Sequence, residues 1–483
     1  MAAVLVVASM LAASFIVDAH ALPRAGGRSF GRSLPGAAIH VLVLTVGFGL
    51  FLVVNGHLQV SALLVTALLA ALVVVSNAKK AVLGEPLLFS DLALAGAIFR
   101  HPQFYMSALR TMQIALLAGG VLALSGLLAW TFEPRAAPHI AGLMVVAAAL
   151  AMLLLLLRLP PWRTLAAVPD AHTAIERHGL LATLVLHASH WRRTVDPPVC
   201  AKPAISSGDT ELVVIVQCES FSDPVELFGD PALALPGLAF ARDNACRWGR
   251  LQVSGFGAYT MRTEYGVLFG RSEIDLGFRR FDPFLTAVGE ASHALPARLR
   301  PAGWRSVFVH PHDMGFYSRD RIMPAAGFDE LIGEASFLPP APGAGRYVTD
   351  ATLTSRIIDL AAAARNPTLI YAVTIENHGP WPPDKTNGNA GQSAPYLRLV
   401  RNSDAMLSTL MAALSGLGRP ALLLFFGDHR PSIPGLSDPE GDRDTPFVMV
   451  RYDASGALMR RETQSEDLAP AELHHALLHE LSG

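Results

Sequence analysis

Residues 211–219 have the sequence Glu-Leu-Val-Val-Ile-Val-Gln-Cys-Glu, an apolar run that ends in a carboxylate. Continuous apolar runs of this length are typical of strands that are buried on both faces of a parallel sheet. Three later stretches, 306–310, 368–375 and 421–426, follow the same pattern, and helical patterns lie between them at 351–364 and 394–414. Because strands alternate with helices, the sequence predicts an α/β fold around a largely parallel sheet.

Reactive side chains follow the carboxyl ends of these four predicted strands. They are Glu219 after the first, His310 at the end of the second, Glu376, Asn377 and His378 after the third, and Asp428 and His429 after the fourth. Ligands of open α/β sheets bind outside the carboxyl ends of the strands. One polar residue at a strand end commonly serves as a helix cap, but four such ends together predict a single functional site.

Glu219, Asp428 and His429 form a candidate metal site. Two carboxylates and one imidazole suit Mn²⁺ first, with Mg²⁺ or Zn²⁺ as alternatives, because oxygen donors are in the majority. Three protein ligands also leave a position open for a nucleophile or a substrate, as metal-assisted catalysis requires.

Thr260 follows a glycine-rich turn at 255–258 and precedes a helix that the pattern predicts over 261–268. The exposed N–H groups and the dipole of a helix N-terminus favour anions such as phosphate. A threonine hydroxyl that is bound to a metal is also easier to deprotonate. Taken alone, this turn indicates no more than a helix cap.

The N-terminal third has a different composition. The chain of 483 residues is 51% hydrophobic and only 16% charged, against about 25% charged in typical soluble domains. Residues 1–160 contain 13 of the 78 charged side chains. Five apolar stretches lie at about 1–17, 37–54, 59–76, 112–132 and 139–157, and the last four reach the length of about 20 residues that crosses a bilayer. The composition excludes an ordinary cytosolic enzyme and predicts a multi-pass membrane protein with a water-soluble C-terminal part.

Two N-terminal segments have more than one interpretation. Residues 1–17 are either a signal peptide or an uncleaved span, and the lack of Lys or Arg before the apolar run favours the span. Residues 84–92 form either an interfacial or re-entrant segment or a plain connecting helix, with Ser90 or Asp91 as the cap of a short helix to about Phe99.

A junction separates the two halves. Residues 170–193 are predicted to form one amphipathic helix on the membrane surface, and its four histidines are interpreted as interfacial polar groups rather than as a metal cluster. Pro197, Pro198 and Pro203 then indicate a linker. The expected organisation is a transmembrane region over 1–160, an interfacial helix and linker over 161–207, and a catalytic domain over 208–483, which closes with a helix within 451–483.

Net charge and cysteine content exclude further classes. The formal charge of −2 does not provide the basic surface of a nucleic-acid-binding protein. Three cysteines, Cys200, Cys218 and Cys246, are too few for a disulfide framework, and a single Cys200–Cys246 bridge stays open.

Five motifs follow one another in the soluble half: Cys218-Glu219-Ser220-Phe221, Thr260 to Tyr265 with Leu268-Phe269-Gly270, His310 to Asp320, Asn377-His378-Gly379-Pro380-Trp381 and Gly427-Asp428-His429. With these motifs the soluble half resembles the lipoteichoic acid synthase and phosphoglycerol transferase family, a sulfatase-like branch of the alkaline phosphatase superfamily. The resemblance covers about 208–450 and, more loosely, the N-terminal spans.

The resemblance implies a role for each matching residue. Thr260 is the implied nucleophile, because it precedes Glu264 at the family's Thr-x-x-x-Glu spacing, whereas the rival Thr263 is out of register. The implied metal ligands are Glu219, Thr260, Asp428 and His429. The implied substrate-binding residues are His378, for phosphate, and His310, Tyr317 and Arg319, for the head group. Tyr317 replaces a tryptophan that is usual in the family.

The resemblance also implies a reaction and a location. A phosphoglycerol-type group would pass from a phosphatidylglycerol-like donor, through phospho-threonine, to a glycan or lipid-linked acceptor. A hydrolase that uses the same site, such as a phosphodiesterase, is the alternative, and a non-enzymatic sensor is a third hypothesis. Such enzymes act on the outer face of the inner (cell) membrane, which implies a periplasmic catalytic domain. Seven Lys and Arg residues in the loops after the first and third predicted spans argue for the opposite orientation.

Overall fold

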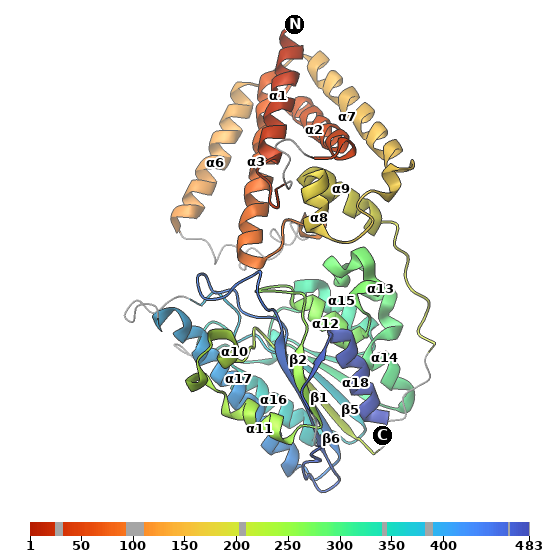
Figure 1. Cartoon of the computed structure of the whole chain (residues 1–483), viewed down its shortest axis with the longest axis vertical. Helices are drawn as coiled ribbons and strands as arrows, with labels where there is room; N and C mark the ends of the chain where they lie inside the picture. The colour runs from red at the N-terminus through yellow and green to blue at the C-terminus, as the bar shows by residue number, and fades with distance from the viewer. Residues whose placement is uncertain are drawn as a thin grey trace. The chain divides into compact units, whose positions relative to one another are not determined.

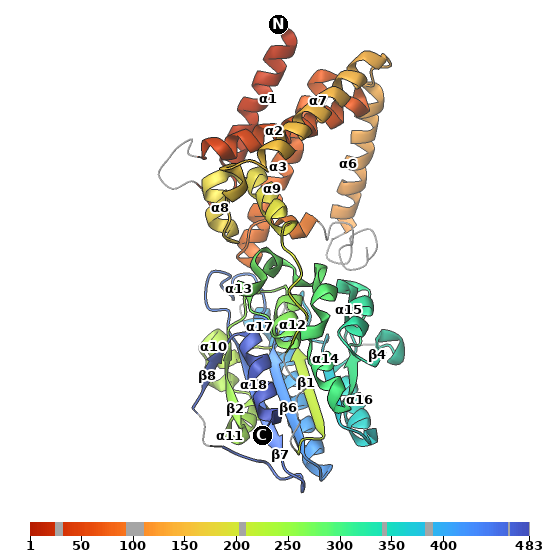
Figure 2. The same ribbon diagram turned by 90° about the vertical axis from the view of Figure 1, so that its right-hand side faces the viewer.

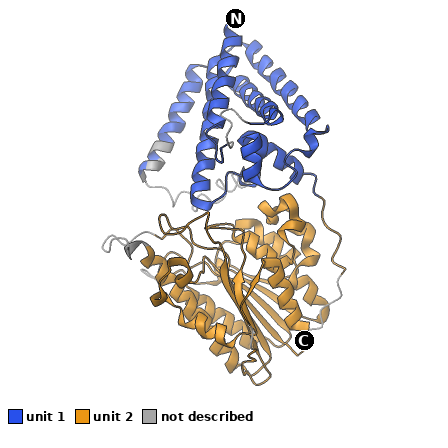
Figure 3. Ribbon diagram, viewed as in Figure 1, with its two compact units in different colours: residues 1–194 blue, residues 195–483 orange. Residues whose placement is uncertain are grey.

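The structure is a computed structural model of the whole chain (Figure 1), and it describes residues 1–24, 32–92, 111–201, 209–340, 345–381, 390–461 and 464–482. The chain divides into two compact units, residues 1–194 and 195–483 (Figure 3). The division falls inside the segment 161–207, which the sequence assigned to a junction.

The first unit consists of helices. They are α1 (Ala2–Asp18), α2 (Leu34–Asn55), α3 (Leu58–Leu83), α6 (Thr111–Trp130), α7 (Ala136–Leu156), η1 (Trp162–Thr164), α8 (Ala171–His178) and α9 (Leu180–Trp191). Helices therefore occupy all five predicted apolar stretches. Among the described residues, α2, α3 and α7 are long and apolar enough to cross a membrane, whereas α1 and the 118–130 part of α6 are apolar but shorter.

The single amphipathic helix predicted over 170–193 is wrong. Two helices, α8 and α9, meet at Gly179, whose backbone has φ 86° and ψ 168°. A Cβ atom at Gly179 would lie 2.6 Å from a carboxylate oxygen of Asp18, and the other oxygen of that carboxylate accepts a hydrogen bond from the backbone N–H of Leu180. Leu180 and Ala182 are completely buried. The segment packs within the first unit instead of presenting one polar face.

Three of the four histidines of this segment form hydrogen bonds to other parts of the first unit. His172 pairs with the carbonyl of Gly84 at 3.1 Å, His178 with the hydroxyl of Ser33 at 2.6 Å, and His190 with the carbonyl of Leu165 at 2.7 Å. They form no metal cluster within the described residues.

The segment 84–92 is buried against α3. Leu87 and Leu88 are buried, and Asp91 both forms an ion pair with Lys79 and accepts a hydrogen bond from the backbone of Leu88. The rest of the short helix that was predicted to reach about Phe99 falls on 93–99, outside the described residues.

The second unit contains one eight-stranded sheet. Its strands are β1 (Leu212–Cys218), β2 (Arg247–Leu251), β3 (Arg305–Val309), β4 (Glu330–Ile332), β5 (Thr368–Val373), β6 (Ala421–Gly427), β7 (Thr445–Tyr452) and β8 (Glu466–Leu468). Their order is β4-β3-β5-β1-β6-β7-β2-β8. All neighbours are parallel except β7, which is antiparallel to both β6 and β2. The predicted α/β fold with a mostly parallel sheet is confirmed.

Helices cover both faces of the sheet (Figures 1 and 2). The α-helices are α10 (Pro224–Phe228), α11 (Pro236–Asn244), α12 (Thr260–Phe269), α13 (Glu273–Leu276), α14 (Leu295–Leu299), α15 (Arg319–Ala325), α16 (Asp350–Ala363), α17 (Ala390–Gly416) and α18 (Pro470–Ser482). Short 3₁₀ helices are η2 (Pro231–Leu233), η3 (Gly277–Phe281), η4 (Pro283–Leu285), η5 (Ala287–His293), η6 (Arg300–Ala302), η7 (Phe316–Ser318) and η8 (Glu334–Ser336).

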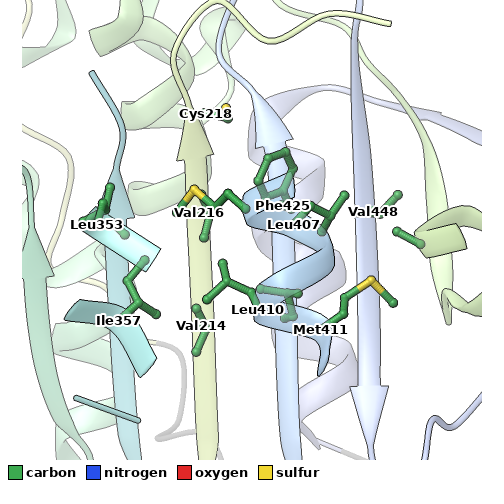
Figure 4. Close-up of a cluster of buried hydrophobic side chains, with 14 of the residues drawn as sticks. Val214, Val216, Cys218, Leu353, Ile357, Leu407, Leu410, Met411, Phe425 and Val448 are labelled. Carbon is green, nitrogen blue, oxygen red and sulfur yellow. The ribbon is translucent and has the colours of Figure 1, made fainter. Parts of the chain in front are cut away.

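A buried apolar cluster joins one face of the sheet to α16 and α17 (Figure 4). Val214 and Val216 of β1 face Leu353 and Ile357 of α16 and Leu410 of α17 in this cluster. Alternate residues of a strand point to opposite faces. Val213 and Ile215 are also completely buried, so β1 is covered on both sides, as its unbroken apolar run predicts.

The register of the sheet brings strand ends together. Cys218 at the end of β1 pairs with Gly427 at the end of β6, and Val309 of β3 pairs with Ala372 of β5. The residues that follow these positions therefore emerge at the same edge of the sheet.

Two further expectations are now decided. The stretch 451–483 is not only a closing helix, because it also contains the end of β7 and strand β8, which pairs with β2. All three cysteines are described and free, so the open Cys200–Cys246 pairing does not occur in this structure.

Candidate metal centre

Glu219, Asp428 and His429 converge at the carboxyl ends of β1 and β6. All three are buried, and one ligand atom from each lies within 4.8 Å of the others. His429 Nε2 is 3.5 Å from Glu219 Oε1 and 3.6 Å from Asp428 Oδ2. No other group of three or more His, Cys, Asp or Glu residues gathers in this way within the described ranges.

Gly427 allows the two strand ends to approach each other. A Cβ atom at this position would lie 2.0 Å from the carbonyl oxygen of Phe221, a distance that no side chain tolerates. The close approach lets the backbone N–H of Ser220 donate to Asp428 Oδ1 at 2.8 Å. Ser220 has a φ of 50°, a strained value for a residue with a side chain, and such strain is concentrated at functional sites.

Thr260 is the first residue of α12 and lies beside the three ligand candidates. Its Oγ1 is 3.5 Å from His429 Nε2. Tyr259, which precedes it, has a φ of 75° and turns the chain sharply into the helix. The rival Thr263 is completely buried, and its hydroxyl donates to the carbonyl of Asp428 at 2.7 Å. Thr263 therefore holds the backbone of the site, whereas the hydroxyl of Thr260 faces the ring of His429.

Burial and neighbouring charges shift the pKa values of two of the three ligand candidates, Asp428 and His429. Burial, together with the nearby charge of Glu219, raises the pKa of Asp428 to about 7. Burial opposes the charged form of His429, but the carboxylates of Asp428 and Glu219 outweigh this effect and raise its pKa. Asp428 Oδ2 is buried and has no hydrogen-bond partner among the described residues. Such a group is costly unless something outside the chain compensates for it.

These residues fit a divalent cation. Metal bonds of about 2.0–2.2 Å place tetrahedral ligands about 3.3–3.6 Å apart. The separations of 3.5 and 3.6 Å that surround His429 Nε2 match that spacing. Two carboxylates, an imidazole and a hydroxyl also form a donor set that such ions accept.

Arg319 has a different environment from the one that its predicted substrate role suggests. Its guanidinium donates to both oxygens of Glu264, from Nε at 3.0 Å and from Nη2 at 2.5 Å. Both side chains are buried, at 2% and 0% exposure. The pair joins α12, which begins at the candidate nucleophile, to the start of α15.

His310 and Tyr317 lie around this ion pair. His310 Nδ1 donates to the carbonyl of Val373 at 3.0 Å, and burial, helped by the charge of Arg319, lowers the pKa of His310 well below its usual value. The neutral ring therefore presents Nε2 as a hydrogen-bond acceptor. Tyr317 is half-buried, with its ring centroid 5.3 Å from the guanidinium carbon of Arg319.

His378 is exposed and lies against a residue that the sequence analysis missed. Its Nδ1 donates to the carbonyl of Gly379 at 2.8 Å, and its ring centroid is 5.7 Å from that of Tyr347. A lone tyrosine before a helix carries no sequence signal, and only the structure brings Tyr347 to this site.

Two other predicted strand-end residues hold loops in place. Glu376 accepts hydrogen bonds from the backbone of Asp350 at 2.8 Å and from Asn402 at 2.9 Å. Asn377 donates to the carbonyl of Ser220 and accepts from Trp381 Nε1. Their roles follow from these internal bonds.

Comparisons with known proteins place this geometry in a wider context. A profile of the protein family described as Sulfatase matches residues 211–478. The capsular polysaccharide biosynthesis protein RkpI of Rhizobium meliloti (strain 1021) is 30% identical over 441 residues, which are 84% of this chain and 80% of that protein.

Two solved structures are also similar. The integral membrane protein lipooligosaccharide phosphoethanolamine transferase A (EptA) from Neisseria meningitidis is 13% identical, and the match covers 94% of this chain and 96% of that one with a TM-score of 0.53. The Streptococcus pyogenes phosphoglycerol transferase GacH, in complex with sn-glycerol-1-phosphate, is 17% identical over 58% of this chain and 76% of that one, with a TM-score of 0.46. EptA shows that the helical region and the α/β domain occur together in one known fold.

Proposed function

The chain belongs to the sulfatase family, and from this premise we propose that it is a membrane-anchored, divalent-metal-dependent phosphotransferase. It moves a phosphoglycerol-type group from a phosphatidylglycerol-like lipid to a cell-envelope glycan or lipid-linked acceptor through a phospho-threonine intermediate. One observation carries the proposal. A threonine hydroxyl at a helix N-terminus lies beside a buried Glu-Asp-His group that has an uncompensated carboxylate oxygen.

The nucleophile distinguishes this site from a sulfate-ester hydrolase. That reaction in the family needs a Cys or Ser in a Cys/Ser-x-Pro-x-Arg motif, which is converted to formylglycine, and the sequence contains no such motif. Thr260 has a hydroxyl that can attack phosphorus directly. Sulfatase-like therefore describes the fold of this chain, and the chemistry follows from Thr260.

Glu219, Asp428, His429 and Thr260 are the residues that would hold the cation. When bound, a divalent ion neutralises phosphoryl charge and lowers the pKa of a coordinated hydroxyl. Mn²⁺ is our first candidate, and Zn²⁺ and Mg²⁺ are tested beside it. The N-terminal N–H groups of α12 point to the same place and favour the phosphate.

The reaction proceeds in two displacements. Thr260 Oγ loses its proton and forms a bond to phosphorus. The bond from phosphorus to the diacylglycerol oxygen breaks, and that departing oxygen takes up a proton. An acceptor hydroxyl then attacks the phospho-threonine, which restores the Thr260 hydroxyl. His378 supports phosphate binding or proton delivery to the departing oxygen, because Nδ1 is held by Gly379 and Nε2 remains the proton-exchanging nitrogen.

The acceptor and the location rest on further support. The relative RkpI is described as a protein of capsular polysaccharide biosynthesis, which supports a glycan acceptor. Helices α2, α3 and α7 are able to anchor the chain in the lipid that contains the donor. We place the catalytic domain on the periplasmic face of the inner membrane, against the distribution of basic residues. A phosphatase reporter fused at Gly483 should be active, because such a reporter works only outside the cytoplasm. A silent reporter would overturn this orientation.

The deciding experiment incubates full-length protein with radiolabelled phosphatidylglycerol, with and without a glycan acceptor, in Mn²⁺, Zn²⁺ or Mg²⁺. We expect label on Thr260 and then on the acceptor. Thr260→Ala should lower turnover by about 10⁴-fold or more, as removal of a nucleophile does in other enzymes. The paired variant Thr263→Ala should keep the labelled intermediate.

The outcomes separate the candidate reactions. Label that passes only to water, even with an acceptor present, indicates the alternative phosphodiesterase. If the labelled intermediate still forms in Thr260→Ala but not in Thr263→Ala, the nucleophile is Thr263. Wild-type protein that neither binds a divalent ion nor forms a labelled enzyme would leave only the non-enzymatic hypothesis.

A further inference from the structure

Tyr347 lies between two histidines at the edge of the candidate active site. Its ring centroid is 6.0 Å from that of His312 and 5.7 Å from that of His378. The charge of Glu219, one of the three ligand candidates, also acts on the phenol. The side chain therefore borders the residue that we propose for phosphate binding and lies within electrostatic range of the metal centre.

The hydroxyl of Tyr347 is buried and has no hydrogen-bond partner in the described part of the chain. Three other buried phenols of the same domain have partners, whereas the hydroxyl of Tyr265 in α12 resembles that of Tyr347 in having none among the described residues. Tyr371 donates to Gln217, Tyr396 donates to the carbonyl of Ser220, and Tyr452 donates to the carbonyl of Met411. A buried hydroxyl without a partner costs about 1–3 kcal/mol, so an unsatisfied one at a site edge indicates a group that binds something outside the chain.

The phenol is equipped to donate rather than to accept. Burial raises the pKa of Tyr347, and Glu219 adds to this effect while Arg346 opposes it, so the hydroxyl keeps its hydrogen at neutral pH. The guanidinium carbon of Arg346 is 4.9 Å from the centroid of the ring, on the same side chain that the histidines contact. An acceptor-only partner of negative charge is the best match for such a donor, and a phosphoryl oxygen has that character.

We propose that Tyr347 is a substrate-binding residue, which donates its phenolic hydrogen to a non-bridging phosphoryl oxygen of the transferred group. The proposal rests on the proposed function, because it requires a phosphoester at the Thr260 site. It adds a neutral side-chain donor to a site whose other proposed phosphate contacts are a histidine, a cation and the backbone N–H groups of α12. A neutral donor binds the phosphoryl group without holding it by charge after transfer.

The test compares Tyr347→Phe with Tyr452→Phe in the full-length protein. Both variants lose only a buried hydroxyl, and Tyr452 lies outside the site, where it bonds to α17. Three quantities are measured for each: the melting temperature, the affinity for glycerol phosphate in the presence of Mn²⁺ or Zn²⁺, and kcat/KM with the lipid donor.

We expect opposite results from the two variants. Tyr347→Phe should melt at or above the wild-type temperature, because no internal hydrogen bond is lost, and both glycerol phosphate affinity and kcat/KM should fall by about 10- to 100-fold. Tyr452→Phe should melt at a lower temperature and keep wild-type affinity and kinetics.

Several results would overturn the proposal. Unchanged affinity and kinetics in Tyr347→Phe would show that its hydroxyl does not touch the substrate. A melting temperature that falls as far as that of Tyr452→Phe would show that the hydroxyl has a partner within the protein. Wild-type protein that binds glycerol phosphate but transfers nothing would reject the proposed function alone, and the affinity comparison would still decide the role of Tyr347. Wild-type protein that neither binds nor transfers would reject both.

Discussion

Glu264 and Asp428 are both completely buried carboxylates of the same domain, yet their environments are opposite. Both oxygens of Glu264 accept hydrogen bonds from the guanidinium of Arg319. Asp428 has one satisfied oxygen and one without a hydrogen-bond partner in the described part of the chain, and its charged surroundings include a second carboxylate, Glu219, as well as His429 at 3.6 Å.

The difference separates structural charge from functional charge. In the Arg319–Glu264 pair each buried charge has its partner within the chain, and we call this pair closed. It holds α12 against α15. A buried acidic group that the chain leaves incomplete needs a cation from outside. Burial alone would not distinguish the two sites, whereas counting partners for each oxygen does.

Among the changes that test this difference between the two carboxylates, removal of the cation should have the largest effect. Treatment with a chelator should lower transfer activity by about 1000-fold or more, and re-addition of Mn²⁺ or Zn²⁺ should restore it. If the ion is held at 100 times its Kd, its loss should also lower the melting temperature by about 5–10 °C. A protein that a chelator leaves unchanged in both respects would show that the open site has no cation.

Breaking the closed pair should be the next largest effect. Arg319→Met leaves the charge of Glu264 buried and unpaired, which should destabilise the protein by about 3–5 kcal/mol in denaturant unfolding. The double variant Glu264→Gln/Arg319→Met should recover most of this loss, because neither charge remains.

The same variants test the predicted substrate role of Arg319. A double variant that folds with wild-type stability but transfers slowly would support contact between Arg319 and the substrate. A single variant that costs less than about 1 kcal/mol would contradict the description of the pair as closed.

In metal-free protein, neutralising Asp428 and neutralising Glu264 should change the stability in opposite directions. Asp428→Asn removes a buried charge that lies beside the carboxylate of Glu219 and that His429 and the Ser220 N–H compensate only in part, so the variant should be more stable than the wild type by about 1–2 kcal/mol. Glu264→Gln should be less stable, because it leaves the charge of Arg319 buried and unpaired. Stability that falls in both variants would mean that Asp428 has a partner within the protein.

Asp350 is an intermediate case and should give the smallest effect. Its Oδ2 accepts from the hydroxyl of Ser403 at 2.6 Å, its Oδ1 has no partner in the ranges that the structure describes, and burial raises its pKa to about 7. The folded protein binds a proton here that the unfolded chain releases near pH 4, so the stability contributed by this group falls as pH rises from about 4 to 7.

Melting curves at pH 5 and pH 8 test this dependence. Asp350→Asn should gain a few degrees over the wild type at pH 8 and less at pH 5. Asp359→Asn, an exposed change on the same helix, should follow the wild type at both values. Equal shifts for Asp350→Asn at the two pH values would place its titration outside this range.

Local patterns predicted much of the molecule. The strand over 211–217 and the five apolar helices could be read from single stretches, because the hydrophobic periodicity of a stretch depends only on its own residues. The position of Glu219, Asp428 and His429 at one edge followed from the rule that parallel strands end together. The resemblance added Thr260, and the structure brings its hydroxyl to His429.

Other features could not be predicted in this way. The break at Gly179 depends on the carboxylate of Asp18, which is far away in sequence. Strand β8 has only three residues and exists because β2 offers it an edge. Arg319 was predicted to contact substrate because its position matched a motif, but its charge is already neutralised by Glu264 across 55 positions.

The sequence by itself determined which segments are strands, which are membrane-length helices and at which edge the reactive groups emerge, because these properties come from local hydrophobic patterns and strand direction. Only the tertiary structure decided which buried charges are satisfied and which remain open, and that Tyr347 borders the site. The physical reason is that a hydrogen bond or an ion pair depends on distances of a few ångströms between residues that are remote in the chain, and no local pattern encodes those distances.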